Sequence, residues 1–208
     1  MPTLAIVSQK GGSGKTTLAI NLAVTASAEG QRACVIDTDP QATAATWADW
    51  RGDRQPEVIT CPPARLGKTI QAAGKAGAQL IVIDTPPHAD AAAREAVRAA
   101  DLVLIPTRPR AFDLHAIEAT AELVRYAGKP GFVVFNAVPP RATNLIGEVT
   151  EFVESLDLAV CPVRFGDRGA FHHYSSAGEV ASEGDPDGKA AHEVAALWQW
   201  VRQQLGPA

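Results

Sequence analysis

Short apolar runs recur at regular intervals along the 208-residue chain. Each run is of strand length and contains Val or Ile, and none alternates apolar with polar residues. Both faces of such a strand are expected to be buried, which is typical of a parallel sheet covered by helices on either side. The predicted strands are residues 4–7, 33–36, 80–83, 102–105, 132–135 and 159–163.

Longer segments rich in Ala, Glu, Arg and Leu separate these runs and have the composition of helices. The alternation of strand and helix predicts an α/β fold, a single doubly wound domain over residues 1–208 with a mostly parallel sheet and helices on both faces. The predicted helices are 15–29, 64–77, 89–100, 113–127, 143–156 and 189–205, the last with an apolar stripe of Val194, Trp198, Val201 and Leu205.

Composition places the chain among ordinary globular proteins. The net charge of −4 gives no overall positive field, so any contact with nucleic acid must come from a local patch. The cysteines Cys34, Cys61 and Cys161 are odd in number and widely spaced, which disfavours a disulfide scaffold or a zinc site. No run resembles a signal peptide or reaches the roughly 18 apolar residues of a membrane span, so we expect a cytoplasmic protein.

Candidate chemistry gathers in the segments that follow the predicted strands. Ligands of open α/β sheets bind beyond the carboxyl ends of the strands. Five of the six segments there carry polar or charged residues next to Pro or Gly, which predicts a site at this edge. The segments are SQKGGSGKTT, DTDPQ, DTPPH, PTRPRAFD, NAVPPR and RFGDRGAF.

The first of these segments almost fits the phosphate-binding pattern G-x-x-x-x-G-K-[ST], with Gln9 in the place of the first glycine. Backbone N–H groups from Gly12 to Thr16 are expected to bind phosphate at the start of a helix. Lys15 would then reach the β- and γ-phosphates, and the Thr16 hydroxyl would ligate Mg²⁺. A dinucleotide pattern is disfavoured because it would need glycine where Thr17 stands.

Acidic residues follow two other predicted strands. Asp84 comes directly after LIVI and is expected to hold Mg²⁺, although an acid in that position can also cap a turn. Asp37 and Asp39 lie about twenty residues past the phosphate loop. A lone acid there could bind a ribose hydroxyl, whereas paired acids beside a Mg²⁺–phosphate site favour orientation of an attacking water.

Taken together, KGGSGKTT, DTDPQ and DTPP resemble the ParA/MinD group of deviant Walker A ATPases, whose loop has the form KGGxGKT[ST]. The resemblance covers the whole chain, and AFHHYSSAGEVASEGDPDGKAAHEV is similar to the family's usual stretch before its last helix. Because the phosphate loop begins almost at once, we expect no N-terminal DNA-binding extension. In this respect the chain is most similar to the small plasmid-partition ParA proteins of the ParF type.

The resemblance implies a role for each matching position. Lys10 would be the signature lysine that crosses an ATP-bound dimer to the partner's phosphates, and Asp39 would position the hydrolytic water. Asn136 would contact the adenine, with the loop 162–166 beside the base. The implied sets are Lys10, Lys15 and Asp39 for catalysis; Lys10, Gly11, Gly12, Ser13, Gly14, Lys15, Thr16, Thr17 and Asn136 for nucleotide; and Thr16, Asp37 and Asp84 for metal.

The function implied by the resemblance is Mg²⁺-dependent ATP hydrolysis in the service of DNA segregation. An ATP-bound homodimer would bind non-specific DNA and associate with the nucleoid, and a ParB-like partner would stimulate hydrolysis. Alternatives are the same cycle acting on another cargo, such as a chemotaxis cluster, an enzyme compartment or the division site, and a small-molecule ATP-dependent synthetase. A scaffold whose polymerisation depends on ATP is a further alternative.

Several other side chains are candidates for a functional role. Arginines after three different strands should share one edge, where they form either a DNA patch or ordinary solvated surface. Trp47 and Trp50 are expected to pack, and the adjacent His172 and His173 would not face the same way on a helix, which disfavours a metal pair. A membrane role of the last helix is disfavoured because it has a conventional core stripe. The arginines are Arg108, Arg110, Arg141, Arg164 and Arg168.

Overall fold

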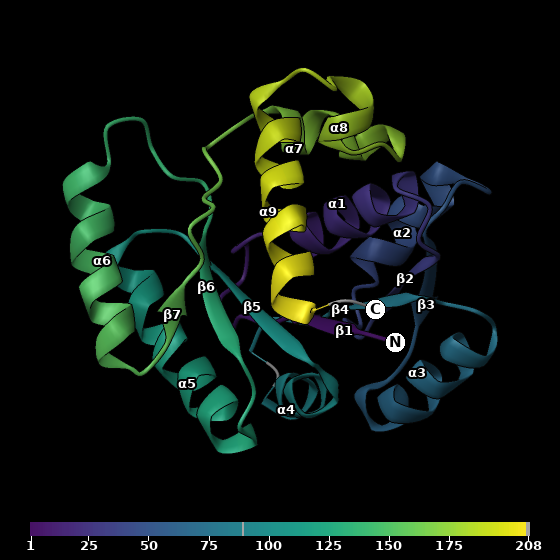
Figure 1. Cartoon of the computed structure of the whole chain (residues 1–208), viewed down its shortest axis with the longest axis horizontal. Coiled ribbons are helices and arrows are strands. Elements are labelled where there is room, and N and C mark those ends of the chain that lie inside the picture. The colour runs from purple at the N-terminus through teal and green to yellow at the C-terminus, as the bar shows by residue number, and fades with distance from the viewer. Residues whose placement is uncertain (89, 207–208) are drawn as a thin grey trace.

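The computed structural model describes residues 1–88 and 90–206. Within these ranges seven strands form one sheet in the order β3-β2-β4-β1-β5-β6-β7, and every pairing is parallel (Figure 1). The strands are β1 (Thr3–Ile6), β2 (Ala33–Asp37), β3 (Glu57–Thr60), β4 (Leu80–Asp84), β5 (Leu102–Thr107), β6 (Gly131–Phe135) and β7 (Ala159–Val160). The predicted doubly wound α/β fold is confirmed.

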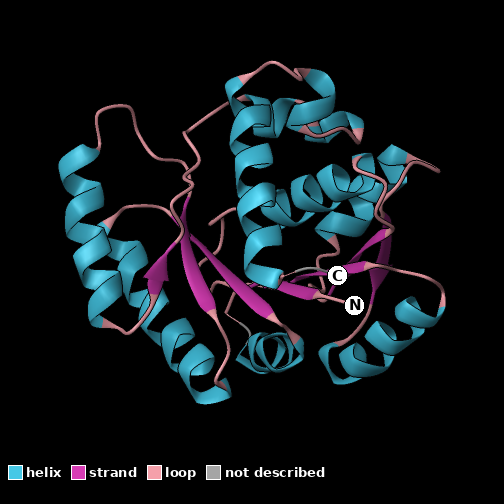
Figure 2. Cartoon of the chain, in the orientation of Figure 1, coloured by secondary structure: helices cyan, strands magenta, loops and turns pink. Residues whose placement is uncertain are grey.

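Helices cover both faces of this sheet, as the cyan and magenta elements of Figure 2 show. They are α1 (Lys15–Ala28), α2 (Thr43–Arg51), α3 (Leu66–Lys75), α4 (Asp90–Ala99), α5 (Ala111–Ala127), α6 (Thr143–Ser155), α7 (Ala170–His173), α8 (Ala181–Gly184) and α9 (Lys189–Leu205), with short 3₁₀ turns at Pro63–Arg65 and Ser175–Ala177. One hydrophobic core packs α1, α2, α8 and α9 against the sheet. A second core packs α3, α4, α5 and α6 against the sheet.

The structure differs from the predicted elements at the sheet edges. Strand β3 was not predicted, because EVIT is a partly exposed edge strand without a continuous apolar run. The last predicted strand is only Ala159–Val160, since Pro162 has no N–H to continue the ladder. Residue 89, where one helix was predicted to begin, lies outside the described residues.

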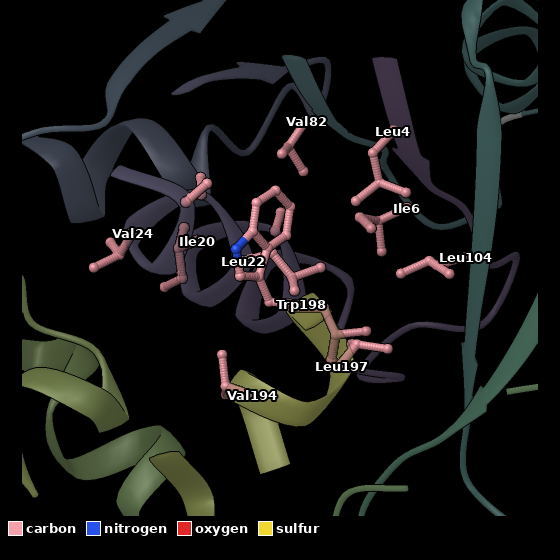
Figure 3. Packing of buried hydrophobic residues seen from close by; sticks show 14 of the residues in the cluster. Leu4, Ile6, Ile20, Leu22, Val24, Val82, Leu104, Val194, Leu197 and Trp198 are labelled. Carbon is pink, nitrogen blue, oxygen red and sulfur yellow. The ribbon is translucent and has the colours of Figure 1, made fainter. Parts of the chain in front are cut away.

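Helix α9 confirms the prediction for 189–205, and its apolar stripe lies in the core (Figure 3). Val194 and Trp198 are almost fully buried against α1 and the sheet. The Trp198 indole Nε1 donates a hydrogen bond of 3.0 Å to Glu29 at the end of α1. The stripe is therefore used for packing, and none of the helices described is long and apolar enough to cross a membrane.

An ion pair ties α2 to the segment before α9. The Arg51 guanidinium donates to both carboxylate oxygens of Glu183, at 2.8 and 2.9 Å, and also to the carbonyl of Gly178. Arg51 also stacks over Trp47, which is buried as expected, whereas Trp50 is 56% exposed and does not pack as predicted. This contact fixes the far end of the helix that follows the acidic segment DTDPQ.

Glu183→Ala is expected to lower the free energy of unfolding by about 3 kcal/mol at pH 7, because it leaves the buried charge of Arg51 without the carboxylate that compensates it. Burial by itself would raise the pKa of Glu183, but hydrogen bonds and charge from Arg51 outweigh it and lower that pKa. The stabilisation is thus complete above the ordinary pKa of Glu and is lost as pH falls through the lower folded value.

Urea unfolding of the wild type and the variant at neutral and acid pH measures this difference. Glu95→Ala is the control, because its ion pair with Arg98 is exposed and should contribute little. A difference that stays constant down to the acid range would contradict the role of the Glu183 charge.

Candidate functional site

The segment between β1 and α1 is a glycine-rich loop at the carboxyl edge of the sheet. Gly12 and Gly14 have φ angles of +68° and +100°, which side chains other than glycine rarely adopt. A Cβ atom on Gly14 would also lie 2.0 Å from Nδ2 of Asn136. Gly14, the N-cap residue of α1, has no side chain that could cap the helix, so the first N–H groups of α1 are suited to an anion.

Lys15 is the first residue of α1 and is 7% exposed. Its Nζ donates a hydrogen bond of 3.2 Å to the backbone carbonyl of Lys10. Burial lowers the pKa of Lys15, and the charges of Asp84 and Asp39 oppose that shift. The loop therefore holds a buried ammonium next to exposed helix N–H groups, an arrangement suited to phosphate.

Thr16 and Asp84 meet because β1 and β4 are neighbours in the sheet. The Thr16 hydroxyl donates a hydrogen bond of 2.6 Å to Oδ2 of Asp84. Thr38, which follows β2, donates to the Asp84 backbone carbonyl through its N–H and its hydroxyl. Asp37 lies opposite Asp84 in the register of β2 and β4, so the structure brings together all three residues predicted to hold metal.

The environment of Asp84 fits a cation. Its side chain is buried, and its Oδ1 accepts no hydrogen bond from the residues described. Burial raises the pKa of Asp84 to about 7, a shift that the hydrogen bond from Thr16 opposes and the charge of Asp37 reinforces. A Mg²⁺ ion, which prefers a few carboxylate or hydroxyl ligands and the oxygens of a phosphate, would satisfy this orphaned oxygen.

Asp37 is engaged by the backbone. Its Oδ1 accepts the N–H of Asp39 at 2.9 Å, and its Oδ2 accepts those of Ala44 and Ala45 at 3.0 and 3.2 Å. The sequence did not predict this task, in which a buried carboxylate caps the start of α2. A contribution of Asp37 to the metal shell stays a prediction.

Asp39 follows two residues later and is half-buried. Its Oδ1 accepts a hydrogen bond from the N–H of Gln41, and its charge acts on both Lys15 and Asp84. The acid therefore lies close to the phosphate loop, on the side of β2 and β4. This position suits the predicted interaction with a water molecule.

Asn136 contacts the phosphate loop itself. Its Nδ2 donates a hydrogen bond of 2.8 Å to the carbonyl of Ser13, and its Oδ1 accepts the N–H of Ala137. It also lines a cavity of about 210 Å³, together with loop residues such as Gly12 and Thr17 and part of the segment 166–172. The contact with adenine stays a prediction, but the side chain lies at a cavity that adjoins the loop.

Gln9, in the place of the missing glycine, connects two loops. Its Nε2 donates a hydrogen bond of 2.7 Å to Asp90 at the start of α4, and its carbonyl accepts the N–H of His88. His88 has a left-handed φ of +52°. The pattern gave no signal for this link, since Gln9 and Asp90 are 81 residues apart.

The arginines divide between two cavities that share Arg168. Arg108, Arg110 and Arg168 line the cavity beside the phosphate loop. Arg141 and Arg164 line a second cavity of about 350 Å³ with Arg168. The guanidinium of Arg168 forms an ion pair with Glu193, in which Nε donates a hydrogen bond of 2.9 Å to Oε2. Much of the positive charge of Arg168 is therefore already compensated.

The fold and this loop have counterparts in known proteins. The model of the CobQ/CobB/MinD/ParA nucleotide-binding domain matches residues 4–163. "Maintenance of carboxysome distribution protein A" of Gloeobacter kilaueensis is 34% identical over 207 residues, which is 97% of this chain and 93% of that protein. "Protein ParA" of Rhizobium radiobacter is 34% identical over 54% of this chain and 51% of its own length. The septum site-determining protein MinD from Pyrococcus horikoshii, solved with Mg-ADP, has a TM-score of 0.76 at 20% identity and covers 99% of this chain and 97% of its own.

Proposed function

The chain belongs to the CobQ/CobB/MinD/ParA family of nucleotide-binding domains, and on that premise we propose that it is a Mg²⁺-dependent ATPase whose ATP-bound dimer positions a cargo in the cell. One observation supports hydrolysis above all. The hydroxyl of Thr16 and the carboxylate of Asp84 are hydrogen-bonded to each other at the start of α1, whose first residue is Lys15. The second carboxylate oxygen of Asp84 is buried and has no hydrogen-bond partner among the described residues. This is the donor set of a metal–triphosphate site.

In this proposal each residue of the loop has one task. The N–H groups from Gly12 to Thr16 bind phosphate oxygens, and Lys15 offsets charge on the β- and γ-phosphates. Thr16 and Asp84 would hold Mg²⁺, which when bound would offset the negative charge of the phosphates. Asp39 orients the attacking water by accepting a hydrogen bond from it.

Lys10 links nucleotide to dimerisation. Two triphosphates that face each other across an interface repel, and a cation from each subunit that reaches the other's phosphates reduces this repulsion. Lys10 lies in the phosphate loop, and its carbonyl is held by Lys15. We therefore assign Lys10 to the partner's nucleotide and Lys15 to its own.

The comparisons favour cargo positioning over DNA partition. Similarity to the carboxysome distribution protein extends over 97% of this chain, whereas similarity to the Rhizobium ParA extends over 54%. An enzyme compartment or another protein assembly is thus our first candidate for the cargo, and segregation of plasmid or chromosomal DNA is the second. A small-molecule synthetase is less favoured.

We also assign DNA contacts of the ATP-bound dimer to Arg141 and Arg164, with Arg168 contributing less because of its pair with Glu193. Phosphate contacts of this kind carry no sequence information and weaken with salt. A partner protein that stimulates hydrolysis completes the proposed cycle.

Asp39→Ala is expected to trap the ATP-bound state, because the water is no longer oriented while the phosphate loop is intact. The hydrolysis rate should fall by about 100-fold, the contribution typical of a positioned general base. Phosphate release in the presence of Mg-ATP measures the rate, and light scattering measures whether the dimer persists.

Asp49→Ala serves as the control, since Asp49 is an exposed acid on α2. Rapid hydrolysis by Asp39→Ala would exclude Asp39 as the water-orienting residue. Hydrolysis that is absent from the wild type, with and without non-specific DNA, would contradict the proposed activity itself.

A further inference from the structure

Arg108 comes to the phosphate loop from the neighbouring strand. Strand β5 pairs in parallel with β1, so the residues after β5 lie beside the residues after β1. The backbone on either side of Arg108 is fixed, because the carbonyl of Thr107 accepts the N–H of Asn136 and the carbonyl of Arg108 accepts that of Arg110. The backbone that carries this side chain is therefore held next to the sheet.

The guanidinium of Arg108 lies against Gly12. Its Nη2 is 3.7 Å from the point that a Cβ atom on Gly12 would occupy. Its Nε is buried and has no hydrogen-bond partner among residues 1–88 and 90–206. A buried N–H without an acceptor is costly, and the cavity that Arg108 lines together with Gly12, Gly14 and Thr17 offers room for an acceptor from a ligand.

Charge is divided across the loop. The carboxylates Asp37, Asp39 and Asp84 come from β2 and β4, on one side of β1. Arg108 comes from β5, on the other side. A triphosphate in the loop would therefore have its metal on the side of β2 and β4. The guanidinium of Arg108 would lie on the other side, next to Gly12.

We propose that Arg108 contacts the β- and γ-phosphates of the nucleotide bound to its own subunit and stabilises charge as the terminal phosphate is transferred. In hydrolysis the water oxygen bonds to the γ-phosphorus, the bond to the bridging oxygen breaks and its electron pair remains on ADP, and the protons of the water pass to phosphate and solvent. Arginines that compensate this charge in other phosphate-loop enzymes contribute 10³- to 10⁵-fold to the rate. The inference rests on the proposed ATPase function.

Arg108→Ala and Arg108→Lys test the proposal, with Arg125→Ala as the matched control in the last turn of α5, the helix that follows β5. Arg108→Ala should lower kcat by about 100-fold or more while the Kd for ADP changes only a few-fold, because the contact strengthens as charge moves to the bridge. Arg108→Lys should recover part of kcat, and the control should match the wild type. A kcat for Arg108→Ala within about threefold of the wild type, in a protein with an unchanged melting temperature, would overturn the proposal.

Mixed dimers test which nucleotide Arg108 serves. When Arg108→Ala is mixed with Asp39→Ala, an arginine that acts within its own subunit leaves both sites of the mixed dimer defective, and the rate should not recover. Recovery would assign Arg108 to the partner's nucleotide and would contradict the proposal. Failure of the wild type to hydrolyse ATP would instead contradict the proposed function, so the two failures are distinguishable.

Discussion

Lys15→Ala is expected to abolish measurable binding of ATP. Lys15 is the buried cation at the start of α1, and its Nζ is already directed along the phosphate loop toward the Lys10 carbonyl. Loss of a buried, charge-assisted contact to the β- and γ-phosphates should weaken affinity by about 100-fold or more. Equilibrium titration with a fluorescent ATP analogue in the presence of Mg²⁺ gives the Kd.

The matched control is Lys75→Ala, which removes an exposed lysine from the last turn of α3. The substitution also removes the free-energy cost of burying the Lys15 ammonium, so the variant should fold. Circular dichroism measures whether it does. If Lys15→Ala bound ATP with the affinity of the wild type, the assignment of residues 8–17 to a phosphate site would be wrong.

Lys10→Ala should separate nucleotide binding from dimerisation. The backbone of the loop and Lys15 remain, so the Kd for ATP of a single chain should change only a few-fold. The dimer should be lost, because cations from the opposite subunit no longer reduce the repulsion between the two triphosphates. Light scattering with Mg-ATP and, separately, with Mg-ADP measures the mass in solution.

The control for this variant is Lys68→Ala, an exposed lysine on α3. Combining Lys10→Ala with Asp39→Ala prevents hydrolysis from depleting ATP during the measurement. A double variant that still forms dimers with ATP would exclude the proposed role of Lys10 across the interface.

The fold was predictable where burial dominates the sequence. Strands such as β4 are apolar on both faces, and the apolar stripe of α9 is sufficient by itself to predict a helix. The edge strand β3 escaped prediction because its EVIT segment is only partly buried and gains its pairing from β2. Its Val58 and Ile59 side chains pack against the two cores only in the folded sheet, which a short segment of sequence does not reveal.

The candidate site was predictable where a motif is local. The phosphate loop and Asp84 can each be predicted from a short, continuous stretch of sequence. The pairing of β1 with β4 then brings Thr16 to Asp84. Three further contacts depend on residues far apart in the sequence, for which the chain gives no local signal. They are Gln9 with Asp90, Asn136 with Ser13, and Arg108 beside Gly12.

Asp37 shows a related limit. Its position at the end of β2 suggests a ligand, yet its oxygens accept hydrogen bonds from the N–H groups of Asp39, Ala44 and Ala45. The same carboxylate that would suit a metal also suits the start of a helix, and the sequence alone does not distinguish the two.

In the cycle that we propose, ATP held by this loop controls association of the chain with a second copy. Its most direct test is the mass in solution of the Asp39→Ala protein, measured by light scattering with Mg-ATP and with Mg-ADP. We expect twice the mass of one chain with ATP and the mass of one chain with ADP. The same mass in both nucleotides would contradict this cycle.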